Sequence, residues 1–462
     1  MHPLPVHRLD GCVRKLVENG RPRTSAPFNQ EAFRGTRSFS EARTLPGEGE
    51  AHALPVRIGG VPPLTFNEAR ACVVEMVRAA CAPLRAEGVT VEEVDIEHAA
   101  GRVLARPLCA DRDYPPLARS VRDGFAVRVC DLPGEFRVIG EVRAGESSTQ
   151  RVGPREAIEI MTGAPVPAGA DGIVMVEHVT RDGGLIHTDR TAVPGEFINP
   201  RASEARSGDA VLPPGVRLDY ASIALAATFG IAGLPVFSKP RVAILATGDE
   251  IVPVRETPRE FQIRNSNAYS LAAQVARAGG APEILPVARD NPADTANLIE
   301  RGLDSDLLLL SGGVSAGKYD LVETVLADLG AEFFFDRVKI QPGQPLVFGN
   351  VRGRFFFGLP GNPASTMVTF EIFARAAIEI LSGIERPALP FLLAPLTADF
   401  RHKTGLTRFL PATLRDDGSA VTPIAWQGSG DVPSIARANV YLVAAADRAE
   451  WKAGDQIQVL MK

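Results

Sequence analysis

Small and polar residues follow an apolar segment at residues 311–320, where the sequence reads SGGVSAGKYD. The preceding run at 307–310 is continuously apolar, which is typical of a parallel strand buried on both faces. Residues 311–313 and Ser315 place small side chains and free backbone N–H groups at the end of that strand, where a phosphate can be approached closely. Asp320 then precedes an apolar periodic segment, and it is either a helix N-cap or a metal ligand.

The region around this segment alternates between predicted strands and helices. Strands are predicted at 242–246, 284–287, 307–310 and 355–357, and helices at 267–278, 293–303, 320–329 and 363–382. This alternation predicts a doubly wound α/β domain with a parallel sheet.

Polar residues follow each of these strands. Glu250 follows the first, Asp290 the second and the 360–363 segment the last. Because ligands of open parallel sheets bind beyond the carboxyl ends of the strands, we expect these groups to converge. Asp290 also fits a helix start before Pro292, and Glu250 also fits a surface position. If the acids converge with Asp320, they suit a hard cation such as Mg²⁺ beside a phosphate, which implies phosphoanhydride cleavage.

Two further polar positions lie in a predicted β-rich region. Asp123 lies in a turn before an alternating apolar segment, and Thr162 follows the predicted strand at 157–161. Asp and Thr at such positions are commonly turn residues, so the pattern alone leaves both readings open.

A chain of 462 residues is too long for one ordinary core, and several domains are expected. Thr65 and Glu68 form a predicted capping box at the start of a helix at 64–86, and 91–106 has a second helix-like pattern. The predicted parts are a disordered extension at 1–58, a discontinuous linker domain with helices at 59–110 and 206–237, a β-rich domain at 111–205, the α/β domain at 238–387 and a C-terminal β barrel at 388–462.

The composition narrows the class of protein. Apolar residues make up 45% and charged residues 23% of the chain, as in globular domains that are soluble in water. A net charge of −5 argues against nucleic acid as a partner. The sequence has no apolar run of membrane-spanning length, no N-terminal signal pattern and no CxxC pair, so we expect a cytoplasmic protein without a membrane or zinc site.

Six motifs together resemble the molybdopterin molybdenumtransferase family, which includes bacterial MoeA and the gephyrin E domain. They are SVRDGFAV (120–127), TGAPVPAGAD (162–171), ATGDEIV (246–252), SGGVSAGKYD (311–320), QPGQP (341–345) and GLPGNPAS (358–365). The resemblance runs from about residue 64 to the C-terminus. It implies a transferase of molybdenum cofactor biosynthesis, an elongated homodimer that inserts molybdate into adenylylated molybdopterin with Mg²⁺-dependent release of AMP.

The resemblance also assigns roles to residues. The implied catalytic residues are Asp123, Thr162, Glu250, Asp290 and Asp320, with Asp290 and Asp320 as Mg²⁺ ligands and Glu250 as a further candidate ligand. The implied substrate-binding residues are Ser311, Gly312, Gly313, Ser315 and Lys318 for the pterin phosphate or nucleotide, and Gln341, Gln344, Pro360, Gly361, Asn362, Pro363 and Ser365 around molybdate. In the implied dimer, Asp123 and Thr162 reach a site on the other subunit.

One motif departs from the family pattern. The family usually reads KPGKP where this chain has Gln341 and Gln344, so two ammonium groups are missing beside the anions. Our hypothesis is that another cation compensates, and the candidates are Lys318, Lys339, Arg122 and Arg408. Two alternatives stay open: a molybdopterin adenylyltransferase, and a catalytically weakened pterin-binding scaffold. The upstream adenylyltransferase is a candidate partner of the transferase.

Overall fold

The computed structural model describes residues 62–86, 91–146, 148–313 and 321–462. This part of the chain divides into two compact units. The first unit contains residues 95–100 and 106–234, and the second contains residues 62–94, 101–105 and 235–462. Among the described residues, no helix combines the length and the apolar character needed to cross a membrane.

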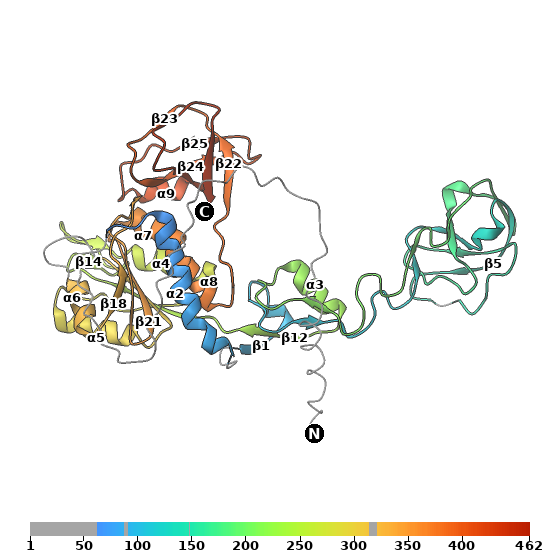
Figure 1. Ribbon diagram of the computed structural model, residues 1–462, viewed down its shortest axis with the longest axis horizontal. Helices are drawn as coiled ribbons and strands as arrows, with labels where there is room; N and C mark the ends of the chain where they lie inside the picture. The colour runs from blue at the N-terminus through green and yellow to red at the C-terminus, as the bar shows by residue number, and fades with distance from the viewer. Residues whose placement is uncertain (1–61, 87–90, 147, 314–320) are drawn as a thin grey trace, which may run out of the picture. The chain divides into compact units, whose positions relative to one another are not determined.

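A six-stranded sheet lies at the centre of the second unit (Figure 1). Its strands are β16 (Ala281–Ile284), β13 (Arg241–Ala246), β17 (Leu307–Ser311), β21 (Arg354–Leu359), β20 (Val347–Val351) and β18 (Glu332–Phe335), in spatial order. The first four are parallel, and the last two are antiparallel to their neighbours. All five residues of β17 are buried, as the continuous apolar run predicts.

Helices cover both faces of this sheet (Figure 1). One face carries α2 (Phe66–Ala86), α4 (Asn267–Ala278), α7 (Pro363–Thr369), the π-helix η4 (Phe370–Ala374) and α8 (Arg375–Leu381), and the other carries α5 (Pro292–Gly302) and α6 (Leu321–Asp328). Alternate strand residues enter the two layers: Ile244 packs in the first and Leu245 in the second. The predicted doubly wound α/β class is confirmed.

The predicted capping box at the start of α2 is present. The Thr65 backbone N–H donates to Glu68 Oε2 over 2.8 Å, and the Glu68 backbone N–H donates to Thr65 Oγ1 over 3.3 Å. One turn on, the Arg70 guanidinium donates to the carbonyl oxygens of Ile372 and Pro387. Burial lowers the pKa of Arg70 to about 10. These contacts fix α2 against the helical layer of the α/β domain.

Three local predictions need correction. Residues 91–106 form strand β1 (Val91–Asp95) and a 3-10 helix η1 (Ile96–His98), not a helix, because strand pairing overrides a weak apolar period. The strand predicted at 284–287 is β16 and lies earlier, at Ala281–Ile284, where it pairs in parallel with Arg241–Ile244 of β13. Strands β18 and β20 were not predicted, and they add an antiparallel edge to the parallel sheet.

A second sheet in this unit is formed by strands from residues 391–461 and by one short strand from residues 340–341. Its strands, in spatial order, are β19 (Ile340–Gln341), β24 (Thr407–Leu414), β26 (Val440–Ala444), β28 (Gln456–Met461) and β22 (Phe391–Pro395), with β25 (Val421–Pro423) on β24. The short strands β23 (Phe400–Arg401) and β27 (Glu450–Trp451) pair separately, and α9 (Val432–Arg437) precedes β26. The loop before α9 contacts the α/β domain, where Ser429 O accepts a hydrogen bond from Ala364 N over 2.9 Å.

The first unit is built on another six-stranded sheet. Its strands, in spatial order, are β7 (Gly172–Met175), β4 (Gly124–Val127), β6 (Glu156–Ile160), β5 (Gly134–Val142), β9 (Leu185–Thr188) and β8 (Thr180–Asp182). Both faces are buried, since Ala126 packs in one core cluster and Phe125 in another. Smaller elements are β2 (Leu108–Cys109), β3 (Arg119–Ser120), β10 (Ile198–Asn199), β11 (Ala210–Leu212), α3 (Tyr220–Thr228) and the 3-10 helices η2 (Val129–Asp131) and η3 (Val176–His178). The chain passes to the second unit within β12 (Gly233–Phe237).

Candidate active site at the ends of the parallel strands

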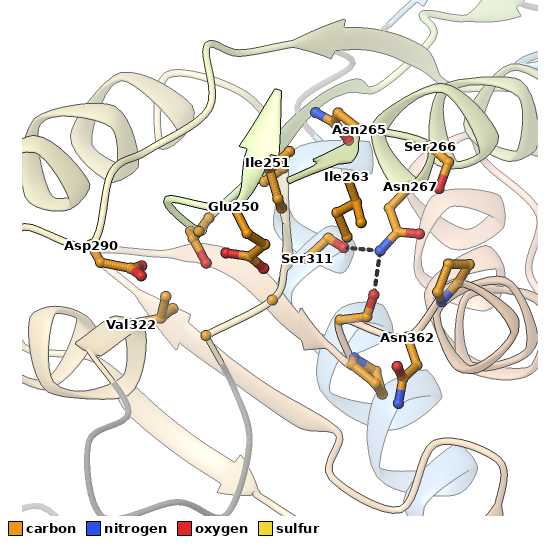
Figure 2. A pocket seen from close by; sticks show the side chains of 18 of the residues that line it. Glu250, Ile251, Ile263, Asn265, Ser266, Asn267, Asp290, Ser311, Val322 and Asn362 are labelled. Carbon is orange, nitrogen blue, oxygen red and sulfur yellow. Dashed lines mark hydrogen bonds between the residues drawn. The ribbon is translucent and has the colours of Figure 1, made fainter. Parts of the chain in front are cut away.

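A cavity of about 1050 Å³ opens at the carboxyl ends of β13, β17 and β21 in the second unit. Its lining includes Thr247, Gly248, Glu250 and Ile251 after β13, Asp290 after β16, Ser311 to Gly313 on and after β17, Pro360 to Pro363 after β21, and Ile263 to Asn267 before and at the start of α4. Figure 2 shows these side chains converging from separate elements. The predicted crevice is therefore a real cavity, at the place that the strand-end rule indicates.

Glu250 and Asp290 meet because the loops after β13 and β16 are joined. Thr247 and Ala288 form a parallel bridge, and Gly248 N donates to Ala288 O over 3.1 Å. Asp290 N also donates to Asp249 Oδ1 over 3.3 Å. In Figure 2 the carboxylates of Glu250 and Asp290 are directed toward the same part of the cavity.

Helix capping does not explain the position of Asp290. The N-cap of α5 is Asn291, whose Oδ1 accepts from the backbone N–H groups of Ala293 and Asp294. Within the described part of the chain, neither Asp290 nor Glu250 has an ion-pair partner, and no cluster of three or more potential metal-ligating side chains occurs. The predicted third ligand, Asp320, lies outside the described residues, as do Ser315 and Lys318.

The two glycines after β17 permit a close approach of the backbone. Gly312 has φ +94° and Gly313 has φ +65°. A Cβ atom on Gly312 would lie 2.8 Å from Thr247 O, and one on Gly313 would lie 2.6 Å from Val322 Cγ2. Gly312 N donates to Leu359 O over 3.3 Å, which continues the pairing of β17 with β21. Because no side chain fits at Gly313, its backbone can approach an anionic ligand closely.

Three residues before and at the start of α4 were missed by sequence reasoning. Asn265 caps the helix, since its Oδ1 accepts from Ala268 N over 3.1 Å. Asn267 is buried and contacts Ser311 and Gly361, and Arg264 lines the cavity with a guanidinium whose Nε donates to Glu256 O. The sequence feature that could have indicated these residues is the polar run at 264–267 at the start of a strongly periodic helix.

Asp123 and Thr162 meet in the first unit. Strands β4 and β6 are antiparallel, with Gly124 opposite Ile160, so the residue before β4 lies beside the residues after β6. Asp123 Oδ1 accepts from Thr162 N over 2.6 Å and from Thr162 Oγ1 over 2.8 Å. The backbone hydrogen bond first, and then the hydroxyl, hold the pKa of Asp123 below its ordinary value.

Comparison with known proteins identifies the family of this chain. Residues 64–230 match the MoeA N-terminal region (domain I and II), residues 243–380 a probable molybdopterin binding domain, and residues 393–462 the MoeA C-terminal region (domain IV). A protein of Bacillus subtilis (strain 168) named molybdopterin molybdenumtransferase is 34% identical over 401 residues, which are 84% of this chain and 93% of that protein. The chain belongs to the molybdopterin molybdenumtransferase family.

Other members of this family and their structures agree with this result. A molybdopterin molybdenumtransferase of Nostoc sp. (strain PCC 7120) is 35% identical over 325 residues, 68% of this chain and 74% of that protein. The crystal structure of the molybdopterin biosynthesis MoeA protein from Pyrococcus horikoshii OT3 has a TM-score of 0.72 at 25% identity, over 87% of this chain and 100% of that one. The predicted fold class is confirmed.

The glutamines that depart from the motif of the molybdopterin molybdenumtransferase family are not among the residues of the described cavity lining. Pro345 lines the cavity, but the described lining does not include Gln341, Gln344 or Ser365. Gln341 on β19 lies opposite Arg408 on β24, and the buried Arg408 Nε has no hydrogen-bond partner among the described residues. Of the cations named from the sequence, the structure therefore places Arg408 beside a glutamine.

Proposed function

We propose that this chain inserts molybdate into the dithiolene of adenylylated molybdopterin in a Mg²⁺-dependent reaction that releases AMP. Its family assigns it to molybdenum cofactor biosynthesis as a molybdopterin molybdenumtransferase. The observation that supports the detailed reaction is a single cavity that holds two carboxylates beside an amide-rich loop. Such a site suits a phosphoanhydride whose charge is shared between a cation and peptide N–H groups.

The described donor set fits Mg²⁺. Two carboxylates that have no ion-pair partner among the described residues face one part of the cavity, and their mutual repulsion favours a divalent cation between them. Glu250 and Asp290 would hold the ion together with Asp320, whose place lies outside the described residues. When bound, Mg²⁺ would supply positive charge to the oxygens of the phosphoanhydride.

The loop after β17 would hold the phosphate groups. Gly313 would present its backbone N–H group, Gly312 holds the loop against β21 through its own N–H, and Ser311 adds a hydroxyl. We assign Ser315 and Lys318 to the same task from the motif. Arg264 lines the cavity and carries a positive charge that an anionic substrate would contact.

The remaining assignments concern molybdate and a second copy of the chain. Pro360 to Ser365 would border molybdate, together with the segment that contains Gln341 and Gln344. Asp123 and Thr162 would complete the site of a second copy of the chain in a cytoplasmic homodimer. Asp123 is ionised at neutral pH, and the hydrogen bonds from Thr162 lower its pKa further, so it would act as a hydrogen-bond acceptor.

The test is an incubation of the full chain with adenylylated molybdopterin, Mg²⁺ and molybdate. AMP release with molybdenum in the product supports the transferase. ATP consumption without AMP release from the adenylylated substrate indicates the adenylyltransferase, and binding without either reaction indicates the scaffold. EDTA should stop AMP release, and Mg²⁺ should restore it.

Two substitutions connect this activity to the cavity. Asp290→Asn and Glu250→Gln should each lower the rate of AMP release at a given Mg²⁺ concentration. The difference from wild type should become smaller as the Mg²⁺ concentration is raised, because a site of lower affinity is then occupied again. The matched control is Glu260→Gln, an exposed acid outside the cavity lining. If the two variants show the same Mg²⁺ dependence as the control, the assignment of these carboxylates is wrong.

A further inference from the structure

The side chain of Asn267 connects the two loops that border the cavity. Asn267 is the first residue of α4 and is 9% exposed. Its Nδ2 donates to Ser311 Oγ over 2.8 Å and to Gly361 O over 2.8 Å, as the dashed lines in Figure 2 show. One amide group therefore joins the end of β17 to the loop after β21.

These two hydrogen bonds determine whether the Ser311 hydroxyl donates to Asn267 or accepts from it. The carbonyl oxygen of Gly361 can only accept, so the amide atom facing it must be the nitrogen. The amide nitrogen can only donate, so Ser311 Oγ is the acceptor of the second bond. The proton of the Ser311 hydroxyl is then left for another acceptor, and none is placed among the described residues.

The side-chain oxygen of Asn267 indicates that the N–H groups of the amide are what stabilises an asparagine at this position. Asn267 Oδ1 is buried and has no hydrogen-bond partner in the described part of the chain. A buried acceptor without a donor is unfavourable, and an aliphatic side chain of the same size would avoid it. The two hydrogen bonds that Asn267 donates therefore contribute more than the unsatisfied oxygen costs.

We propose that Asn267 is a positioning residue that makes the Ser311 hydroxyl a hydrogen-bond donor to an anionic oxygen of a bound phosphate monoester. This inference rests on the proposed function, which places a phosphate in the cavity. With the opposite polarity, Ser311 would present lone pairs to the ligand and repel an anion. Asn267 also holds the Gly361 loop, so it couples phosphate binding to the part of the cavity assigned to molybdate.

Two variants of Asn267 separate this role from a purely structural one. Asn267→Leu removes both donors and leaves the Ser311 hydroxyl undirected. Asn267→Asp reverses the polarity, because an aspartate accepts the Ser311 proton and withdraws it from the ligand. The matched control is Gln274→Glu on the same helix, where the native amide donates to Met367 O outside the cavity lining.

The assay is calorimetric titration of the full chain with AMP and with adenosine, which lacks the phosphate. At pH 8 we expect Asn267→Asp to lower the affinity for AMP at least about tenfold, the loss of one charge-assisted hydrogen bond, and to leave adenosine binding unchanged. Relative to wild type at each pH, AMP affinity should recover as the pH falls through the pKa of the new carboxyl, because its neutral form carries an O–H donor. Gln274→Glu should show no such recovery.

A double-mutant cycle completes the test. If Asn267 acts through Ser311, Asn267→Leu should have no further effect on AMP affinity in a Ser311→Ala background. Equal losses for AMP and adenosine in Asn267→Leu, or full additivity with Ser311→Ala, would overturn the inference.

The same experiment tests the proposed function separately. A wild type that binds neither AMP nor molybdopterin more tightly than their dephosphorylated forms contradicts the proposed function and the inference with it. If the preference appears only with molybdopterin, the pterin phosphate is the group recognised, and the variants are compared with that ligand. If wild type shows a preference and Asn267→Asp keeps it in full, the inference alone fails.

Discussion

Gly312→Ala is predicted to weaken phosphate binding as well as the fold. Gly312 has φ +94°, a conformation that costs an alanine about 1–3 kcal/mol. Its new Cβ would lie 2.8 Å from the carbonyl oxygen of Thr247, at the end of the central sheet. Overpacking of this kind costs about a further 1–3 kcal/mol, so the total is about 2–6 kcal/mol if the loop stays in place.

The loop can relieve this contact only by moving away from Thr247. Thr247 N donates to Ser311 O over 3.2 Å and Gly312 N donates to Leu359 O over 3.3 Å, so displacement of Gly312 would strain the end of β17 and move the Ser311 hydroxyl and the Gly313 backbone that line the cavity. Because these groups must point at the phosphate to bind it, we expect AMP affinity to fall by about tenfold or more.

Gly353→Ala provides the matched control. Gly353 has φ +81°, but a Cβ there would meet nothing within 4 Å, so only the backbone conformation is penalised. Denaturant unfolding and AMP titration should show a stability loss of about 1–3 kcal/mol for the control with unchanged AMP affinity. Equal AMP affinity for Gly312→Ala and wild type, with a stability loss no larger than that of the control, would refute the close-approach argument.

Three other predictions concern charge. Thr162→Val should raise the lowered pKa of Asp123 part of the way to its ordinary value, because the backbone hydrogen bond remains; a carboxyl NMR titration measures it, and an unchanged pKa contradicts the role of the hydroxyl. Since that pKa is lowered, the hydrogen bonds stabilise the fold above the ordinary pKa of Asp, and their contribution is lost as the pH falls through the lowered value. Arg264→Ala should lower the affinity for AMP several-fold and leave adenosine unchanged, which competition titration checks. Gln341→Lys should strengthen, and Arg408→Gln weaken, the molybdate dependence of AMP release; if neither changes it, Arg408 does not compensate for the missing lysines.

Helix starts, helices and strands could be predicted from the sequence where they depend on interactions between residues close together in the chain. The capping box of Thr65 and Glu68, the periodic helix that ends at Ala278 and the buried strand β17 were all predictable, because each depends on residues a few positions apart. The helix predicted at 91–106 was wrong because the same apolar residues also suit a strand, and a distant partner strand decided between the two.

The candidate site was predictable in outline only. The strand-end rule predicted that Glu250 and Asp290 face one crevice, and the structure places both in the cavity lining. Asn267 was missed because its importance depends on Ser311 and Gly361, which lie 44 and 94 residues away. The roles of the individual residues and the domain boundaries stay predictions.

The sequence by itself determined the order of the four parallel strands of the α/β domain and of the helices between them, the apolar layers and the polar residues that follow those strands. Those features arise from side-chain period and turn chemistry, which act over short distances. Only the tertiary structure decided which of these polar residues touch: the bridge between Thr247 and Ala288 brings two acids together, and Asn267 sets the polarity of Ser311. Hydrogen bonds between segments far apart in the chain make those choices, and no local pattern encodes their partners.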